Sequence, residues 1–433
     1  MCDGGGGAPS LELTSLKVIS ALGRGAKGVV FLVQTESSDD EFNHFIALKV
    51  ISRASIEKDK RNNNNDGSEY RRICFEQEVL RSLQHPLFPR LRGTTATDKI
   101  VGYAIDYCPG RDLNSLRKRQ TEKMFSDDLI RFYAAELVLA LEYLHGMGIV
   151  YRDLKPENVM IQENGHLMLV DFDLSTKLPA KPPENRQIVR SVPKPEQIVQ
   201  SVANEKKKKR QFLSYRWCNS GILPEGSATP PELSSISKSS PPESESDSVE
   251  KSNSFVGTEE YVAPEIILGK GHDFAVDWWC LGIMLYEMLY GKTPFRGLNR
   301  KETFYNILHR PPDLVGEQTA LRDLIGKLLE KNLKQRIALE GIKGHDFFEG
   351  VDWNLVMQVH RPPYIPVQPE DTMGNSGIDV ESFVEGIFKT GNEDKVEARK
   401  DSQTQKNDEE SKINGAWAEG LNLSSQTDNF VIF

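Results

Sequence analysis

The segment YRDLKPEN, residues 151–158, is the most specific pattern in the sequence. It carries Asp153, then a lysine two residues later, Lys155, and an asparagine five residues later, Asn158. A long amphipathic helix is predicted before it and the short strand VMI after it. A proton acceptor, a cation and a neutral oxygen ligand so close together favour phosphoryl transfer. We expect Asp153 to orient and deprotonate a hydroxyl, Lys155 to contact the transferred group and Asn158 to bind magnesium.

A second acidic position follows in LVDFDLSTKL, residues 169–178. Asp171 ends the predicted strand HLMLV, and its carboxylate is a hard oxygen ligand of the kind that Mg²⁺ prefers. We expect Asp171 to chelate magnesium that bridges nucleotide phosphates, and Phe172 to pack inward.

A glycine-rich segment lies near the beginning of the chain, with Gly23, Gly25 and Gly28 in the pattern G-x-G-x-x-G. Alone, this pattern also fits a flexible turn. A dinucleotide-binding fold would place a helix directly after the glycines, whereas here the strand-like VVFLV follows. The glycines are therefore expected on a turn between two strands, where their backbone can lie close over phosphates.

One lysine, Lys49, ends the apolar stretch IALK. It is either a surface lysine of an edge strand or a cation that holds the α- and β-phosphates. In the second case a half-buried lysine needs a carboxylate partner. Glu76 and Glu78 of the next predicted helix are the candidates, and the spacing to Leu80 favours Glu76.

The order of predicted elements indicates an α+β protein with a small β-rich lobe and a larger helical lobe. The expected boundaries are a disordered terminus at 1–15, the small lobe at 16–110, the large lobe at 111–350 and a tail at 351–433. The Asn-rich segment 58–68 is expected as a loop. Residues 176–255 are rich in Ser, Pro, Lys and Glu, which predicts a mostly disordered insertion.

Bulk composition excludes some partners and leaves others open. Of 433 residues 38% are hydrophobic, and the net charge of −9 gives no general attraction to nucleic acid. The most apolar run, residues 280–289, is too short to span a bilayer, which favours the cytoplasm or nucleus. The run Lys206–Arg210 fits a nuclear signal, a patch that contacts anionic lipid at the plasma membrane, or a solvated charge run.

From Leu16 to Gly350, apart from the insertion, the chain resembles the eukaryotic protein kinases. Ala263-Pro-Glu265 is similar to the motif that ends their activation segment, and Asp277 to the buried aspartate that supports the catalytic loop. Arg336 resembles the arginine that pairs with Glu265. The resemblance implies the bilobal kinase fold, with ATP and Mg²⁺ as cofactors and Ser or Thr of proteins as acceptors.

Within the superfamily the chain resembles the AGC serine/threonine kinases. Ser254-Phe-Val-Gly-Thr258 is similar to their activation-loop site, which implies a phosphate on Ser254 that Arg152 helps to receive. The terminal Phe430-x-x-Phe433 resembles their hydrophobic motif, which docks on the small lobe or on the upstream phosphoinositide-dependent kinase. DFD in place of DFG, with the long insertion, is similar to plant AGC VIII kinases. LGRGAKGVVFLV and the terminal FxxF most resemble the oxidative-signal-inducible members.

The resemblance also implies the remaining site residues. Glu157, Glu287 and Asp112 match an acidic rim that selects basic substrates, and Thr258 is assigned to substrate binding; ordinary surface carboxylates are the alternative, and Asp112 also fits a ribose contact. The residues expected around adenine are Val30, Ala47, Asp106, Cys108 and Met160.

Three positions depart from the family pattern. Tyr151 replaces a histidine, Lys27 replaces an aromatic residue of the glycine loop, and Asp173 replaces a glycine after Asp171 and Phe172. Asp173 is either a neutral variant or a regulatory change, because a residue with a side chain resists unusual backbone angles. We expect an active, monomeric kinase; the alternatives are a catalytically weak kinase-fold scaffold acting through the insertion and tail, and a metabolite kinase.

Overall fold

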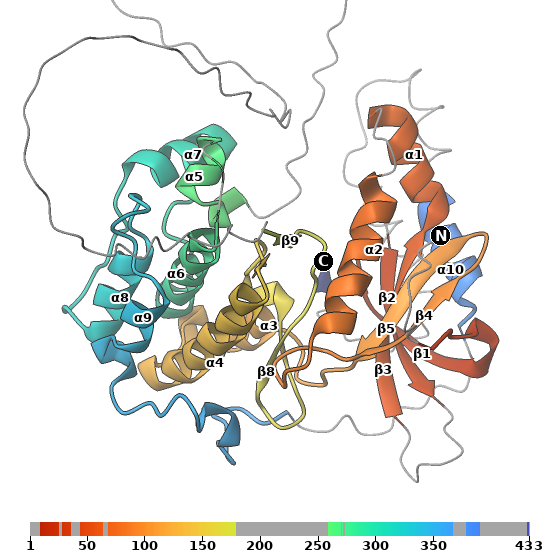
Figure 1. Ribbon diagram of the computed structural model, residues 1–433, viewed down its shortest axis with the longest axis horizontal. Helices are drawn as coiled ribbons and strands as arrows, with labels where there is room; N and C mark the ends of the chain where they lie inside the picture. The colour runs from red at the N-terminus through yellow and green to blue at the C-terminus, as the bar shows by residue number, and fades with distance from the viewer. Residues whose placement is uncertain are drawn as a thin grey trace, which may run out of the picture. The chain divides into compact units, whose positions relative to one another are not determined.

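The fold was analysed in a computed structural model of the whole chain (Figure 1). The structure describes residues 9–25, 28–35, 44–63, 68–178, 259–269, 271, 273–366, 378–389 and 431–432. The chain divides into two compact units, residues 1–180 with 255–433 and residues 181–254. All described residues belong to the first unit, so most of the predicted insertion lies outside them.

A twisted six-stranded sheet forms the small lobe, as predicted. Its order is β10-β1-β2-β3-β5-β4. The strands β1 to β5 pair antiparallel, while β10 pairs parallel with β1, Val431 beside Gly23. The bounds are β1 Leu16–Arg24, β2 Gly28–Thr35, β3 His44–Ser52, β4 Leu91–Ala96, β5 Ile100–Asp106 and β10 Val431–Ile432.

Three helices accompany this sheet: α1 (Arg53–Asn63), α2 (Ser68–Ser82) and α10 (Val380–Lys389). The sequence predicted α2, but it assigned residues 58–68 to a loop, and α1 shows that this was wrong for 58–63. Tertiary contacts outweigh the polar composition here, because Ile56 is buried and the Arg53 side chain donates to Thr97 O at 2.7 Å.

The tail helix α10 was not predicted, because residues 370–425 are polar on average and the apolar face of α10 is short. Val380 and Val384 are buried against Phe31, Leu48 and Val50 of the sheet. The ring of Phe383 meets that of Phe31 edge-on, with centroids 5.5 Å apart. Part of the tail is therefore built into the small lobe.

Two predicted boundaries need correction. Residues 9–15 were assigned to the disordered terminus, yet Leu11 N donates to Thr94 O at 2.8 Å and a 3₁₀ helix spans Leu13–Ser15. At the beginning of the insertion, β9 (Thr176–Lys177) pairs with β6 (Ile149–Val150), so residues 176–178 belong to the fold.

The helices α3 to α9 form the second lobe, as predicted (Figure 1). The Ser126 side chain caps α4 by accepting from Leu129 N, and Gly291 ends α6 with a positive φ of 70°. The helix bounds are α3 Leu113–Lys118, α4 Asp127–Gly146, α5 Pro264–Ile267, α6 Ala275–Tyr290, α7 Arg300–His309, α8 Ala320–Leu328 and α9 Leu339–Lys343.

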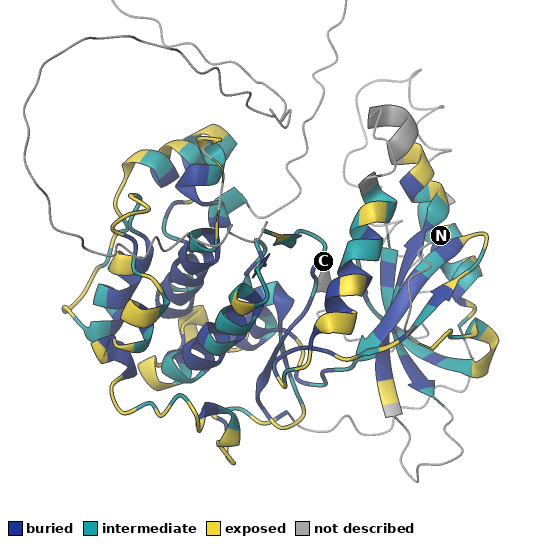
Figure 2. Ribbon diagram, viewed as in Figure 1, coloured by how far each residue is buried: buried dark blue, intermediate teal, exposed yellow. Residues whose placement is uncertain are grey.

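Burial is greatest along α6, whose residues are dark blue over most of its length (Figure 2). Trp279 is fully buried there and stacks on Phe295 with ring centroids 5.6 Å apart. Beside the helices, the hairpin of β7 (Val159–Ile161) and β8 (Leu167–Leu169) carries the segments that the sequence singled out. No helix of the described residues is long and apolar enough to cross a membrane.

Candidate active site

Lys49 lies on the face of β3 opposite to the one that packs on α10. Its neighbours Leu48 and Val50 are fully buried in the α10 cluster, and because side chains alternate along a strand, Lys49 points the other way. Its Nζ lies 3.1 and 3.3 Å from the two carboxylate oxygens of Glu76 and 2.9 Å from Oδ1 of Asp171. The lysine thus pairs with Glu76 and not with Glu78, which is exposed.

These three charges control one another's protonation. Burial opposes the charge of Lys49, but the carboxylates of Asp171 and Glu76 outweigh it and raise its pKa well above the usual value. Burial also acts against the charge of Asp171, yet Lys49 holds the pKa of that carboxyl below its usual range. Burial raises the pKa of Glu76, which Lys49 opposes.

The backbone of the loop 151–158 is held by hydrogen bonds to Asp277 of α6. This aspartate is fully buried and accepts from Tyr151 N at 2.9 Å, Arg152 N at 2.8 Å and the His145 ring. Arg152 adopts φ 67°, an uncommon value for a residue with a side chain. Strain of this kind persists only where the surroundings impose it, which the Asp277 contacts do.

The loop brings Asp153, Lys155 and Asn158 together. Lys155 Nζ lies 2.9 Å from Asp153 Oδ2, and the Asn158 amide donates to the same oxygen at 2.8 Å. Burial raises the pKa of Asp153, and Lys155 opposes this shift. A carboxylate held between a cation and an amide donor can accept a proton while its geometry stays fixed.

The residues present fit a magnesium ion. Asn158 is 1% exposed, and its Oδ1 is a buried oxygen that has no hydrogen-bond partner among the residues the structure describes. Asp171, with φ 61°, supplies a carboxylate, and Val170 N donates to Asn158 O at 3.0 Å, which joins the two segments. Because Mg²⁺ is bound through one or two protein oxygens together with water and phosphates, this pair is a sufficient protein contribution.

The glycine turn joins β1 and β2, as predicted. Gly25 N donates to Gly28 O at 2.9 Å. A Cβ on Gly28 would lie 2.3 Å from Val50 O, so only glycine fits this position. Lys27 lies outside the described residues, and Gly23 belongs to β1 beside β10.

The residues predicted to surround adenine lie in an apolar cluster and in the neighbouring strands of the sheet. Cys108, Met160, Met168 and Val170 form one apolar cluster with Ile105, and Ala47 pairs with Ile105 in the sheet. Val30 lies opposite Lys49 in β2. The side chain of Asp106 is already engaged by Arg90 N and Arg92, so only its backbone is available to a purine.

The three carboxylates of the predicted acidic rim all have partners within the fold. Both carboxylate oxygens of Asp112 accept from Ser115, because Asp112 caps α3 and is 1% exposed. Glu287 pairs with Arg117 at 2.8 Å and accepts from the Tyr261 hydroxyl. Glu157 accepts from Asn114 at 2.8 Å and forms no ion pair among the described residues.

Several predicted positions lie outside the described residues: Ser254, Thr258, Phe430, Phe433 and the basic run Lys206–Arg210. For these the expectations stay as stated. Of the terminal motif only the two central residues, Val431 and Ile432, are described, in β10.

Sequence reasoning missed three residues of the site. Tyr103 pairs with Lys49 in the β3–β5 register, and its ring centroid lies 5.6 Å from Nζ. Arg117 neutralises Glu287, and Arg72 of α2 lies 3.9 Å from Asp173 Oδ2. The strand alternation was a signal for Tyr103; nothing in the sequence pointed to the two arginines.

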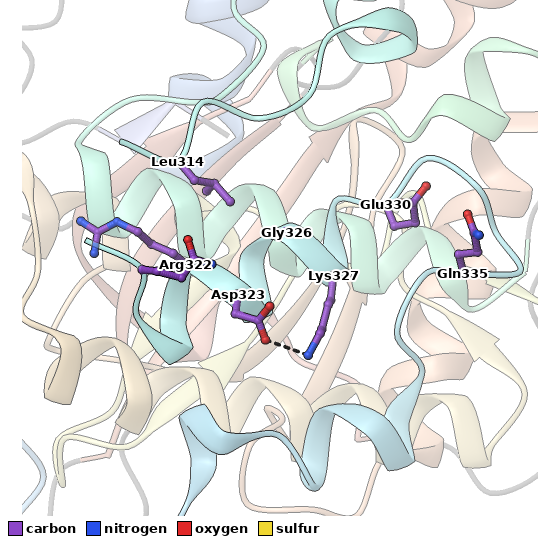
Figure 3. A pocket seen from close by; sticks show the side chains of 8 residues that line it. Leu314, Arg322, Asp323, Gly326, Lys327, Glu330 and Gln335 are labelled. Atoms are coloured by element: carbon purple, nitrogen blue, oxygen red, sulfur yellow. Dashed lines mark ion pairs between the residues drawn. The ribbon is translucent and has the colours of Figure 1, made fainter. Parts of the chain in front are cut away.

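A separate surface pocket lies on α8 (Figure 3). An ion pair of 2.7 Å between Asp323 and Lys327 lies among its side chains. Leu314 is its one bulky apolar residue, so the pocket does not suit a purine. Its lining is Leu314, Gln318, Arg322, Asp323, Gly326, Lys327, Glu330 and Gln335, none of which belongs to the site above.

Comparison with known proteins agrees with this geometry. The protein kinase domain family matches residues 16–209 and 239–348. Serine/threonine-protein kinase OXI1 of Arabidopsis thaliana is 54% identical over 98% of both chains. Serine/threonine-protein kinase UCN of the same plant is 40% identical over 88% of this chain and 92% of its own. The rice protein Phototropin-2 is 39% identical over 82% of this chain and 34% of its own.

The chain belongs to the protein kinase family, and within it to the serine/threonine kinases of the plant AGC group. The predicted family and fold class are thereby confirmed.

Proposed function

We propose that this kinase transfers the γ-phosphoryl group of MgATP to Ser or Thr of basic protein substrates. The observation that carries the proposal is that two clusters of charged side chains lie in the same compact unit of the chain. One is Lys49 with Glu76 and Asp171, and the other is the loop with Asp153.

Lys49 supplies a fixed cation for the α- and β-phosphates, and Glu76 holds its ammonium group in place. The glycines would let the backbone of the turn lie close over the same phosphates. Asn158 Oδ1 and the Asp171 carboxylate would hold Mg²⁺, which would neutralise charge on the phosphates.

Asp153 orients the acceptor hydroxyl and takes its proton. The hydroxyl oxygen forms a bond to the γ-phosphorus, and the bond from that phosphorus to the β–γ bridging oxygen breaks with its electron pair going to ADP. Lys155, 2.9 Å from Asp153, stabilises the charge on the transferred group.

The test is transfer of labelled phosphate from ATP to a basic Ser peptide, beside its Ala twin and a panel of small alcohols. We expect label on the Ser peptide alone. Label on the alcohols would favour a metabolite kinase, and no label after pretreatment with an upstream kinase would favour the scaffold.

The preference for basic substrates rests on Glu157. Glu287 is neutralised by Arg117, and Asp112 is buried as the cap of α3, so Glu157 is the rim carboxylate best placed to attract a basic substrate. Glu157→Gln is expected to reduce kcat/KM for an Arg-containing peptide more than for a neutral one. Equal losses on both peptides would remove this assignment.

Activation is proposed through phosphorylation of Ser254, with Arg152 among the groups that receive the phosphate, and Thr258 contributing to substrate binding. Arg152 is a half-buried residue of the loop 151–158 and donates to Leu174 O at 2.6 Å, so it is held near the start of the activation segment. Mass spectrometry of active protein should find phosphate at Ser254, and Ser254→Ala should lower activity. Full activity of that variant would contradict the proposal.

The remaining proposals concern partners and location. Phe430 and Phe433 are proposed to bind the phosphoinositide-dependent upstream kinase, which a pull-down with both changed to Ala would test. The protein is proposed to be a monomer of the cytoplasm or nucleus. Fluorescence imaging of a variant with Lys206–Arg210 changed to Ala tests the role of this run. Loss of nuclear or plasma-membrane fluorescence would support a nuclear signal or a membrane contact, respectively. An unchanged distribution would indicate a solvated charge run.

A further inference from the structure

Three successive residues after β8 are linked to helix α2. Asp171 is linked through Lys49, which contacts both Asp171 and Glu76. Phe172 N donates to Glu76 Oε1 at 3.1 Å. Asp173 Oδ2 lies 3.9 Å from Arg72 NH1. The third contact exists only because this chain has a carboxylate at the position where the general protein kinase pattern, DFG, has glycine.

The spacing on α2 gives the Asp173 contact a geometric consequence. Arg72 precedes Glu76 by four residues, which places both on one face of the helix, one turn apart. Val79 and Leu80 already pack α2 against the core. On the face that meets the segment after β8, the Arg72 contact adds a second fixed point one turn from Glu76, which resists rotation of the helix about its axis.

The charges around Asp173 explain why it needs Arg72. Burial raises the pKa of Glu76, and the charges of Asp171 and Asp173 raise it further. An uncompensated Asp173 would therefore act against the ionised Glu76 that Lys49 requires. Arg72 in turn lies near a like charge: burial lowers the pKa of Arg152, Asp277 opposes this shift, and Arg72 adds to it. Each charge of the pair thus reduces a repulsion around the other.

We propose that Asp173 is a positioning residue: its ion pair with Arg72 fixes the orientation of α2 and so keeps Glu76 against Lys49. This inference rests on the proposed function, because Lys49 matters only if the chain binds nucleotide phosphates. It gives the third residue of DFD a role that glycine cannot fill.

The test is a double-mutant cycle of Asp173→Asn and Arg72→Gln, with the exchange Asp173→Arg with Arg72→Asp as a rescue. Asn keeps the side-chain shape while removing the charge. Because both partners are partly exposed, each single change is expected to raise KM for MgATP roughly two- to fivefold, with kcat less affected. The double variant should be no worse than the single ones, and the exchange should restore much of the loss.

The matched control is Glu69→Gln, since Glu69 is the other carboxylate at Arg72, 3.6 Å away. It should leave KM unchanged or lower it. Additive losses in the double variant, or a Glu69→Gln effect equal to that of Asp173→Asn, would overturn the inference.

Hydrogen–deuterium exchange of the nucleotide-free protein separates this inference from the proposed function. Asp173→Asn should speed exchange of α2 amides at residues 68–82, while Glu69→Gln should not. Unchanged α2 exchange in Asp173→Asn would overturn the positioning role even if the protein transfers phosphate. Faster α2 exchange in Asp173→Asn than in wild type, together with no phosphate transfer by the wild type, would support the positioning role and reject the proposed function.

Discussion

At the scale of single residues, the site depends on side chains that hold one another in place. Lys49 touches two carboxylates from different elements, Glu76 of α2 and Asp171 after β8. Neither carboxylate is near Lys49 in sequence. The lysine is therefore correctly placed only when the sheet, α2 and the β7–β8 hairpin are all in position.

The substitution Glu76→Gln tests this dependence. It leaves Lys49 with Asp171 alone, and we expect kcat/KM to fall about 10- to 100-fold, because breaking a buried ion pair is costly. Steady-state kinetics with MgATP measure the effect. Glu78→Gln on the same helix is the control, since Glu78 is exposed, and an equal loss there would contradict the assignment.

A pH profile tests the pair of Asp153 and Lys155. Burial raises the pKa of Asp153 and Lys155 opposes the shift, so removing the lysine should raise that pKa further. Because Asp153 must be ionised to take a proton, the acid limb of kcat/KM against pH should move to higher pH in Lys155→Met.

The control for this prediction is Lys155→Arg, which keeps the charge and should keep the limb near its wild-type position. An acid limb that stays in place in Lys155→Met would show that Asp153 does not set it.

At the scale of elements, the sequence predicted those with strong periodicity. The alternation in β2 and β3 and the long apolar stripe of α4 identify these elements without any structure. The helices α1 and α10 are short and set in polar sequence, and contacts with distant strands decide them. The same limit applied to the site: spacing identified Glu76, whereas the pairing of Arg72 with Asp173 depends on how two elements meet.

The tail helix α10 gives a prediction of stability. Val384 is 1% exposed, so Val384→Ala removes buried carbon and leaves a cavity. The expected loss is about 2 kcal/mol in the free energy of unfolding. Chemical denaturation followed by circular dichroism measures it.

Gly386→Ala in the same helix is a control that should increase the free energy of unfolding. A Cβ there would meet no described atom within 4 Å, and alanine favours helix by about 0.5–1 kcal/mol. If both substitutions leave stability unchanged, α10 does not pack on the sheet in solution.

At the scale of the whole molecule, a buried ion pair joins the end of the activation segment to the helical lobe. Arg336 contacts the two oxygens of Glu265 at 2.7 and 3.0 Å, and both side chains are almost fully buried. Glu265→Gln would leave a buried guanidinium without its counter-charge, which costs about 3–5 kcal/mol.

The thermal midpoint of Glu265→Gln should fall by several degrees in calorimetry. Asp323→Asn removes a charge that contacts Lys327 and the His345 ring, but Asp323 is exposed, so the change should cost about 1 kcal/mol or less. Equal shifts for the two variants would contradict the structural role of the buried pair.

The central claim is that Asp153 takes the proton of the acceptor hydroxyl in a site that binds MgATP independently of it. The most direct measurement is single-turnover phosphate transfer by wild type and Asp153→Asn, with MgATP affinity measured on the same samples. We predict that the variant binds MgATP within about threefold of wild type while transfer falls by at least about 100-fold. Transfer at the wild-type rate by Asp153→Asn would contradict the account.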